Sequence, residues 1–489
     1  MFAFDTTYTS LPATFFTPQA PTPITASATA PQFLAVNRPL AEALGLDLDW
    51  LSGPEGLAIL AGNRVTDGST PIAQAYAGHQ FGGWVPRLGD GRAVLLGELA
   101  GDFGQALPHR VDVALKGSGP TPYSRRGDGR AWMGPVLREY LVSEAIAALG
   151  VPTTRALAAV ATGARVQRER GYPGAVLTRV AASHLRVGTF QYATAAAMAS
   201  DAPPEERLRD LQALCDYAIA RHYPDADGAL GLLDAVVAAQ ATLIADWMAV
   251  GFIHGVMNTD NMAISGETID YGPCAFMDGY HPQKVFSSID RMGRYAFANQ
   301  PSIAAWNLAQ LATSLLPLME GTEDAAIEAA TRSVNGFVEI FQARWLRNFG
   351  RKIGIAQATT DDLPLIEGLL SRMGTGQVDF TRVFAGLSEG TAATEFTEAH
   401  AWTSWAPEWE ARLTREEDPV GIMRATNPRR IPRNHRVEEM IQAAVEGDMA
   451  PFEHLLAACR APYETRPEWE DLARGPLKDE EVRQTFCGT

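Results

Sequence analysis

The chain has 489 residues, of which 46% are hydrophobic, and carries a formal net charge of −16. This length supplies ample apolar material for a globular core. The negative charge argues against nonspecific nucleic-acid binding, which depends on cationic side chains at phosphates, and four cysteines in so long a chain do not make a disulfide scaffold.

No uninterrupted apolar run reaches the roughly 18 residues that a membrane-spanning helix needs. Residues 229–251 come nearest, but Asp234, Gln240 and Asp246 interrupt them, so a buried helix is expected there. Residues 1–19 lack the basic region and the apolar core of a secretory signal. The sequence therefore predicts a cytoplasmic, monomeric protein with neither a membrane nor a nucleic acid as partner.

The first distinctive segment is glycine-rich. Residues 76–98 carry glycines at positions 78, 82, 83, 89 and 91, and residues 92–98 have the pattern of a strand. Glycine lets the backbone approach phosphates, and successive N–H groups can form an anion-binding nest. A lone glycine cluster is more typical of a turn, but the strand that comes next favours a phosphate-binding loop that includes Gly89 and Gly91.

Residues 110–117, RVDVALKG, alternate as a strand does. Val111, Val113 and Leu115 face one side and Lys116 the other. The VALK sequence closely matches the V-A-I-K strand of protein kinases, in which the lysine pairs with nucleotide phosphates and with a glutamate on a helix. We therefore predict that Lys116 binds phosphate.

A loop and a helix follow this strand. The loop, residues 116–130, contains Asp128 and Gly129 and suggests contacts with phosphate or sugar. A helix is predicted from about Pro135 to about Gly150. Glu139, 23 residues after Lys116, is the expected ion-pair partner of the lysine, and Glu144 is the alternative.

Residues 254–272, HGVMNTDNMAISGETIDYG, resemble the catalytic and metal-binding loops of a kinase, H-R-D-x-x-x-x-N and D-F-G. His254 opens the first loop, Asn261 occupies its metal-ligand position seven residues later, and Asp270 begins the D-Y-G sequence. Val256 stands where a kinase has its catalytic aspartate. Because valine cannot accept a proton, the sequence keeps two metal ligands and lacks the usual base.

Asn261 and Asp270 are predicted to hold Mg²⁺ or Mn²⁺, since a hard cation takes few protein oxygens and completes its shell with phosphates and water. Asp260 precedes Asn261 in the sequence T-D-N. Taken alone, an aspartate in this sequence is more often a turn residue that accepts backbone N–H bonds. Next to a metal ligand, in a loop that lacks its usual aspartate, the turn role and the role of replacement base are about equally compatible with the sequence.

Taken together, these segments resemble the selenoprotein O family, whose members have a kinase-like fold and transfer AMP to protein hydroxyls. The motifs that carry the resemblance extend from about residue 76 to residue 434. They are GHQFGGWVPRLGDGRA, VALKGSGPTPYSRRGDGRA, REYLVSEA, HGVMNTDN, DYGPCAFMD, NQPSIAAWNLAQLA and NPRRIPRN.

The resemblance implies a nucleotide, ATP with UTP as an alternative, that is flipped relative to a kinase. Its γ-phosphate points inward to Arg179, Arg186 and Arg92, and its α-phosphate faces the acceptor. Guanidinium groups suit this task because they bind phosphate oxygens in pairs. The seven-residue gap between Arg179 and Arg186 equals two helical turns, so both are expected on one helix face. The resemblance also makes Asp260 the proton acceptor.

Cys215 and Cys459 lie in helical, alanine-rich contexts and are expected to fill the core. Cys274 follows the D-Y-G sequence, and Cys487 lies third from the end, where eukaryotic members of the resembled family carry selenocysteine. A redox role for Cys487, with Cys274 as one potential partner, stays open.

The predicted fold class is α+β, a kinase-like bilobal fold with a small β-rich lobe, a helical lobe and extensions at both ends. The predicted divisions are an N-terminal extension at 1–75, a small lobe at 76–155, a helical lobe at 156–345 and a helical C-terminal extension at 346–489.

Three functions remain in competition: AMP transfer to protein substrates, a kinase-like phosphotransfer in which Asp260 is the base, and a non-catalytic nucleotide-binding scaffold. The retention of Lys116, Asn261 and Asp270 counts against the scaffold, because a scaffold does not need a complete metal site.

Overall fold

The computed structural model describes residues 1–489 except 25–28, 105–106 and 487–489. Its centre is an antiparallel sheet of eight strands. Seven of them follow the order β1-β3-β6-β7-β10-β9-β2, and β8 pairs with β10. The strands are β1 (Phe16–Pro18), β2 (Gln32–Val36), β3 (Ile72–Gln74), β6 (Ala93–Ala100), β7 (Arg110–Lys116), β8 (Ala131–Trp132), β9 (Arg155–Gln167) and β10 (Gly171–Ala181).

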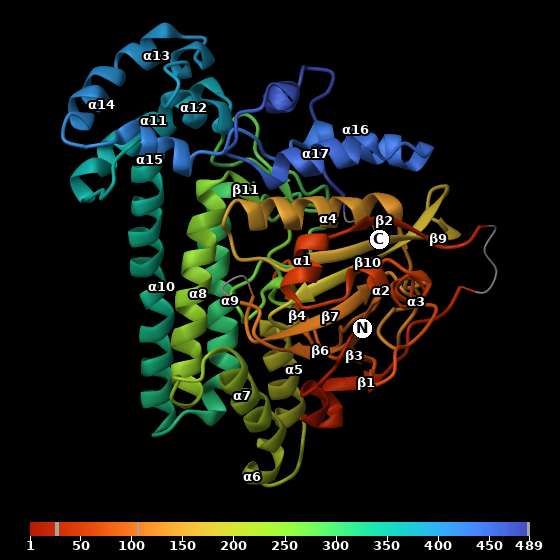
Figure 1. Ribbon diagram of the computed structural model, residues 1–489. Coiled ribbons are helices and arrows are strands. Elements are labelled where there is room, and N and C mark those ends of the chain that lie inside the picture. Colours follow the sequence, from red (N-terminus) through yellow and green to blue (C-terminus); the bar gives the residue numbers. More distant parts are fainter. Residues whose placement is uncertain (25–28, 105–106, 487–489) are drawn as a thin grey trace.

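The alternation predicted for β7 is present. Val111, Val113 and Leu115 are buried in an apolar cluster with the first three helices, which are α1 (Arg38–Ala43), α2 (Leu48–Leu51) and α3 (Pro54–Leu60). Lys116 faces the opposite side, where α4 (Met133–Ala148) packs against β9 and β10 (Figure 1). The period of two therefore separates the apolar side of β7 from the side that carries the lysine.

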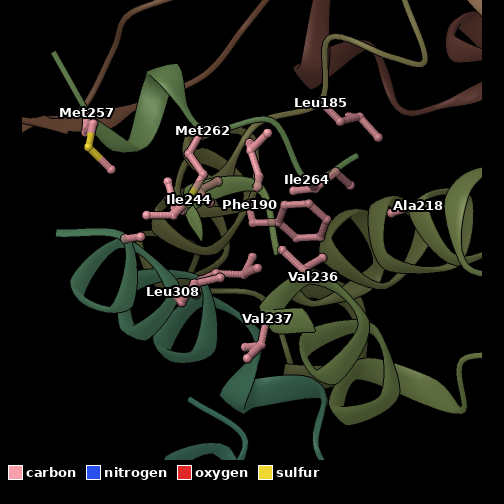
Figure 2. Close-up of a cluster of buried hydrophobic side chains, with 14 of the residues drawn as sticks. Leu185, Phe190, Ala218, Val236, Val237, Ile244, Met257, Met262, Ile264 and Leu308 are labelled. Carbon is pink, nitrogen blue, oxygen red and sulfur yellow. The ribbon is translucent and has the colours of Figure 1, made fainter. Parts of the chain in front are cut away.

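A bundle of helices adjoins the sheet (Figure 1). It contains α5 (Val187–Met198), α6 (Pro204–Arg207), α7 (Arg209–His222), α8 (Gly228–Ala249), α9 (Gln300–Leu315) and α10 (Glu323–Lys352). Figure 2 shows its core, in which Phe190 of α5, Val236 and Ile244 of α8 and Leu308 of α9 point toward one another.

Among the described residues, α8 alone is long and apolar enough to cross a membrane. It packs against α7, α9 and α10, and Asp246 on it forms an ion pair of 2.8 Å with Arg344 of α10. The helix is the buried core helix that the sequence predicts.

The C-terminal helices form two groups. The first, α11 (Leu363–Gly376), α12 (Phe380–Leu387), α13 (Ala399–Thr403), α14 (Ala406–Leu413) and α15 (Pro419–Thr426), contributes to a second apolar core with stacked Trp405 and Trp409. The second contains α16 (Asn434–Glu446), α17 (Ala450–Arg460) and α18 (Glu470–Ala473). Of these, α16 and α17 pack on α4.

Two short antiparallel pairs of strands lie outside the main sheet. They are β4 (Gly78–Gln80) with β5 (Gly83–Val85), and β11 (Phe252–Ile253) with β12 (Ala275–Phe276). Single 3-10 turns complete the fold: η1 (Tyr8–Ser10), η2 (Ala13–Phe15), η3 (Thr259–Asn261), η4 (Phe297–Asn299), η5 (Leu316–Leu318), η6 (Thr360–Asp362), η7 (Ala392–Glu395) and η8 (Pro467–Trp469).

The α+β class is confirmed. One difference from the predicted organisation concerns residues 155–181, which fall in the stretch expected to be largely helical but form β9 and β10 of the main sheet. The N-terminal extension likewise supplies strands to it, since β1, β2 and β3 are all members of the sheet.

Candidate active site

A cavity of about 700 Å³ lies where the sheet meets the loops around η3. It is lined by every residue that the sequence assigned to the nucleotide, the metal or the base. These are Gly89, Gly91, Arg92, Lys116, Asp128, Gly129, Arg179, Arg186, Asp260, Asn261 and Asp270. The chain therefore brings together residues that are up to 181 positions apart in the sequence.

Lys116 lies at the end of β7 and points toward α4. Its Nζ is 2.6 Å from Glu139 Oε2 and 2.9 Å from Asp270 Oδ1. The structure thus contains the predicted ion pair with Glu139. The alternative, Glu144, instead accepts two hydrogen bonds of 2.8 Å from Arg155.

Asp270 is the point on which the cations converge. Besides Lys116, Arg179 donates to Asp270 Oδ1 at 2.7 Å and Arg186 donates to Oδ2 at 2.6 Å. Burial disfavours the ionised carboxylate, but the three positive charges outweigh it and hold the pKa of Asp270 well below its usual value. The residue also has a positive φ of 64°, a conformation that is uncommon outside glycine.

The prediction that Arg179 and Arg186 share a helix face is wrong. Arg179 belongs to β10, where it pairs with Ala114 of β7, and Arg186 is the N-cap of α5. Spacing alone suggested two helical turns, but residues 171–181 are held extended by strands on both sides. The two guanidinium groups still meet, because the strand end and the helix start both border the cavity.

Asp260 lies in the 3-10 turn η3 and is 8% exposed. Its Oδ2 accepts a hydrogen bond of 3.1 Å from Gln80 Nε2, and its Oδ1 has no hydrogen-bond partner among the described residues. Burial raises the pKa of this carboxyl. This oxygen is buried beside Gly78, so the carboxyl of this cavity-lining residue keeps one oxygen that no donor satisfies.

The donor set fits a hard divalent cation. The amide nitrogen of Asn261 donates to the Val256 carbonyl at 3.0 Å, which fixes the side chain and leaves its oxygen available. Asp270 supplies a carboxylate across the cavity. Among the described residues no cluster of three or more His, Cys, Asp or Glu could hold a metal, but Mg²⁺ needs only one or two carboxylates when phosphates supply the other oxygens.

Comparison with known proteins decides the family. Residues 2–460 match the family model described as "Protein adenylyltransferase SelO". The chain belongs to this family. It is 57% identical to the "Protein nucleotidyltransferase YdiU" of Roseobacter denitrificans, over 99% of both chains. It is 58% identical to the protein of the same name from Jannaschia sp., over 100% of this chain and 99% of the relative, and 53% identical to that of Rhodopseudomonas palustris with the same coverage.

As a SelO family member the chain is an enzyme, a nucleotidyltransferase whose acceptors are proteins and whose donor is a nucleoside triphosphate. The resemblance expected from the sequence motifs is confirmed. Val256, which stands in the sequence where a kinase has its aspartate, lines the cavity.

Two glycines of this SelO-family cavity are required by the backbone. Gly89 has a φ of 133° and Gly129 a φ of 63°. A Cβ at Gly89 would collide with the Tyr123 ring, and one at Gly129 would collide with the backbone of Gly119. Asp128, beside Gly129, is held by Arg168 at 2.8 Å. Glycine at these two positions therefore lets the cavity loops pack closely on neighbouring protein segments.

Some buried side chains around the site were missed by sequence reasoning. His184 accepts a hydrogen bond of 3.1 Å from Arg179 Nε through its Nε2, and its Nδ1 lies 2.9 Å from Asp112 Oδ2. Burial lowers the pKa of His184, which favours the neutral ring. The Arg186 guanidinium also lies over the Tyr76 ring, 4.8 Å from its centroid. The position of Asp112 could have been predicted from the sequence, because the alternation of β7 places its side chain on the same side as Lys116.

The structure tests the predictions for the core cysteines but not the prediction for Cys487. Cys215 and Cys459 are buried in α7 and α17, as expected of core residues. Cys274 is also buried, two residues beyond Gly272 of the cavity wall. Cys487 lies outside the described residues, so its redox role stays a prediction.

Proposed function

We propose that this SelO-family enzyme transfers AMP from ATP to serine, threonine or tyrosine hydroxyls of target proteins, with the nucleotide flipped relative to a protein kinase. In this pose the γ-phosphate contacts Arg179 and Arg186, and the α-phosphate lies near Asp260. UTP is the alternative donor. The kinase-like division into a small and a helical lobe belongs to the same proposal.

The observation that carries the proposal is the arrangement of charges in one cavity. Three cationic side chains gather around Asp270, and Asp260 lines the same cavity. Arginines held deep in a low-dielectric site bind phosphate oxygens more strongly than surface arginines do. A triphosphate with its terminal phosphate among these cations leaves the α-phosphate as the group that is open to attack.

The reaction would proceed by displacement at the α-phosphorus. The acceptor hydroxyl oxygen forms a bond to phosphorus, the bond between this phosphorus and the α,β-bridging oxygen breaks, and pyrophosphate leaves. Asp260 takes the hydroxyl proton. Mg²⁺ or Mn²⁺ held by Asn261 and Asp270 would neutralise charge on the phosphates, while Lys116, fixed by Glu139, orients them.

The test is incubation of the enzyme and an acceptor protein with ATP labelled at either the α- or the γ-phosphate. Label should reach protein from the α position only, and should fall to a small residual rate in the Asp260→Asn variant. Transfer from the γ position alone would instead identify a kinase-like phosphotransferase with Asp260 as its base. Nucleotide binding without transfer of either label would identify a scaffold.

A further inference from the structure

The β4–β5 hairpin lies directly against the catalytic loop. His79 N–H donates to Thr259 Oγ1 at 2.7 Å, and the Gln80 side chain donates to Asp260 Oδ2 at 3.1 Å. Phe81, the residue that follows β4, donates its N–H to Asn258 Oδ1 at 3.0 Å. The hairpin therefore borders the position at which an acceptor hydroxyl must meet Asp260.

The same hairpin carries large apolar side chains that the fold leaves uncovered. Phe81 is 39% exposed and Trp84 is 43% exposed. Phe81 has a φ of 53°, which is uncommon for a bulky residue, and with Gly82 it forms the two-residue turn. Exposed aromatic residues beside an active cavity indicate a contact surface, because an enzyme gains no stability from leaving them in water.

A second segment, residues 289–295, meets the hairpin. The Tyr295 ring lies 5.2 Å from the Phe81 ring, and a Cβ at Gly82 would lie 3.7 Å from the Arg294 guanidinium carbon. This segment also exposes apolar side chains, Ile289 at 50% and Met292 at 93%. Two chain segments that are 200 residues apart thus present apolar groups next to each other.

The charge of these two segments is opposite to that of the whole chain. In the second segment Arg291 is exposed and Arg294 is half-buried, and Arg87, which is also exposed, lies two residues beyond β5, whereas the chain as a whole carries −16. The acidic residue of the second segment, Asp290, is buried and accepts hydrogen bonds from the N–H groups of Arg294 and Tyr295. The surface is therefore apolar with a basic border, and suits an acidic partner.

The outer edge of β5 offers backbone groups to a partner. His79 pairs with Trp84 in the hairpin register, and the His79 N–H points away from β5 toward Thr259. In an antiparallel pair this makes His79 and Trp84 a non-hydrogen-bonded pair, so the N–H and C=O of Trp84 point to the outer edge of β5. An extended peptide can bind to such an edge by strand addition.

From these observations we propose that the β4–β5 hairpin and residues 289–295 form the docking surface for the acceptor protein. The occupant is an extended segment in which the modified hydroxyl residue is flanked by acidic and apolar side chains. The acidic side chains would contact Arg291 and Arg87, and the apolar ones would pack on Trp84 and Phe81. This inference rests on the proposed function, whose acceptor it specifies.

The test uses two short peptides with α-labelled ATP. Both carry one central tyrosine with flanking leucines, one has glutamates at the remaining positions, and its counterpart has lysines there. The wild-type enzyme should label the glutamate peptide with a kcat/KM about tenfold higher, because the exposed arginines attract glutamates and repel lysines. Arg291→Glu should remove or reverse this preference. The exposed Arg291 side chain forms no hydrogen bond or ion pair among the described residues, so it can be changed without breaking a contact.

Trp84→Ser should raise KM for both peptides about tenfold or more with kcat nearly unchanged, as expected when an aromatic anchor is lost. Val338→Ser is the matched control, since Val338 is a 50% exposed apolar residue on α10, outside the cavity and the hairpin. ATP affinity, measured by calorimetry, checks that each variant retains its cavity.

Equal use of both peptides, together with unchanged kinetics in Arg291→Glu and Trp84→Ser, would overturn the docking surface. So would conversion of a dimer to a monomer by Trp84→Ser in sedimentation experiments, which would identify a contact between copies of this chain. If the wild-type enzyme labels intact proteins from α-labelled ATP but neither peptide, the docking inference fails and the proposed function stands. If it labels no protein from the α position, the proposed function itself fails.

Discussion

Replacement of Arg179 by methionine tests the flipped nucleotide most directly. Arg179 is 2% exposed and donates to Asp270 at 2.7 Å, to Glu139 at 3.4 Å and to His184 at 3.1 Å. In the flipped pose this guanidinium contacts the γ-phosphate. One hydrogen bond between charged groups contributes about 1.5–3 kcal/mol, so Arg179→Met should weaken ATP binding roughly 10- to 100-fold.

The assay is calorimetric titration of ATP, ADP and AMP into wild type and variant. The loss should be largest for ATP, smaller for ADP and below about threefold for AMP, which has no β- or γ-phosphate to lose the contact. Arg110→Met is the matched control, because Arg110 begins β7, the strand that pairs with β10, but forms ion pairs with Asp5 and Glu98 outside the cavity. It should leave all three affinities unchanged.

Two results would refute the reasoning. Unchanged ATP affinity in Arg179→Met would place the terminal phosphate elsewhere. Equal losses for ATP and AMP would point to damage to the cavity itself, since removing a buried ion-pair partner costs about 3–5 kcal/mol of stability. Thermal denaturation of Arg179→Met separates these explanations, because damage to the cavity lowers the melting temperature and a phosphate bound elsewhere does not. Lys116 and Arg186 remain beside Asp270 in this variant.

The remaining predictions concern the other ionisable groups. Lys116→Ala should abolish AMP transfer with little loss of folded protein by circular dichroism, and wild-type labelling would exclude a phosphate role. Asp270→Ala should eliminate transfer and metal-dependent ATP binding, whereas Asn261→Ala should be milder, because a neutral amide supplies less charge stabilisation than a carboxylate; equal effects on labelling would contradict the ligand assignment. Burial raises the pKa of Asp260, so the acid limb of the pH–rate profile should lie above the usual range of an aspartate, and Asp260→Asn should remove that limb from the residual rate. Burial also lowers the pKa of Lys352 to about 7. Between pH 7 and about 10 the unfolded chain therefore binds the lysine proton, while the folded chain does not. The free energy of unfolding consequently rises with pH across this window, and below pH 7 the burial of the charged lysine destabilises the folded state in full. Lys352→Met should raise stability at pH 7 by about 2–4 kcal/mol in urea denaturation and flatten this rise, and a destabilised variant would show that the amine is favourably bound.

Local patterns in the sequence were sufficient for the parts of the site that depend on one element. The alternation of residues 110–117 identified β7 and the side that Lys116 faces, and the helix signals around Pro135 placed Glu139 within reach of it. Both inferences use the period of a single strand or helix.

What the sequence did not predict depends on pairing between distant segments. Arg179 fits a helical spacing with Arg186, but β10 is extended because β7 and β9 bind it on both sides. The contact of His184 with Asp112 likewise joins two elements 72 residues apart. Neither partner choice is encoded in a local period, so each becomes visible only once the sheet order is known.

The two aspartates of the cavity show how one site can separate two chemical roles. Both carboxyls are withdrawn from water, and burial alone would raise both pKa values. At Asp270 three cations reverse the effect of burial and keep the carboxylate ionised, which suits a metal ligand. At Asp260 one neutral amide, from Gln80, is the side-chain donor and burial prevails, so the pKa rises toward the range in which a carboxyl can exchange a proton. Carboxyls whose surroundings drive their pKa values apart mark the division between charge stabiliser and acid–base group. By that criterion the opposite pKa directions fit our proposal, in which Asp260 takes the role of base that Val256 cannot fill. Arg186 donates to the Asp260 backbone carbonyl at 2.6 Å, but its charge does not reverse the effect of burial on the Asp260 pKa.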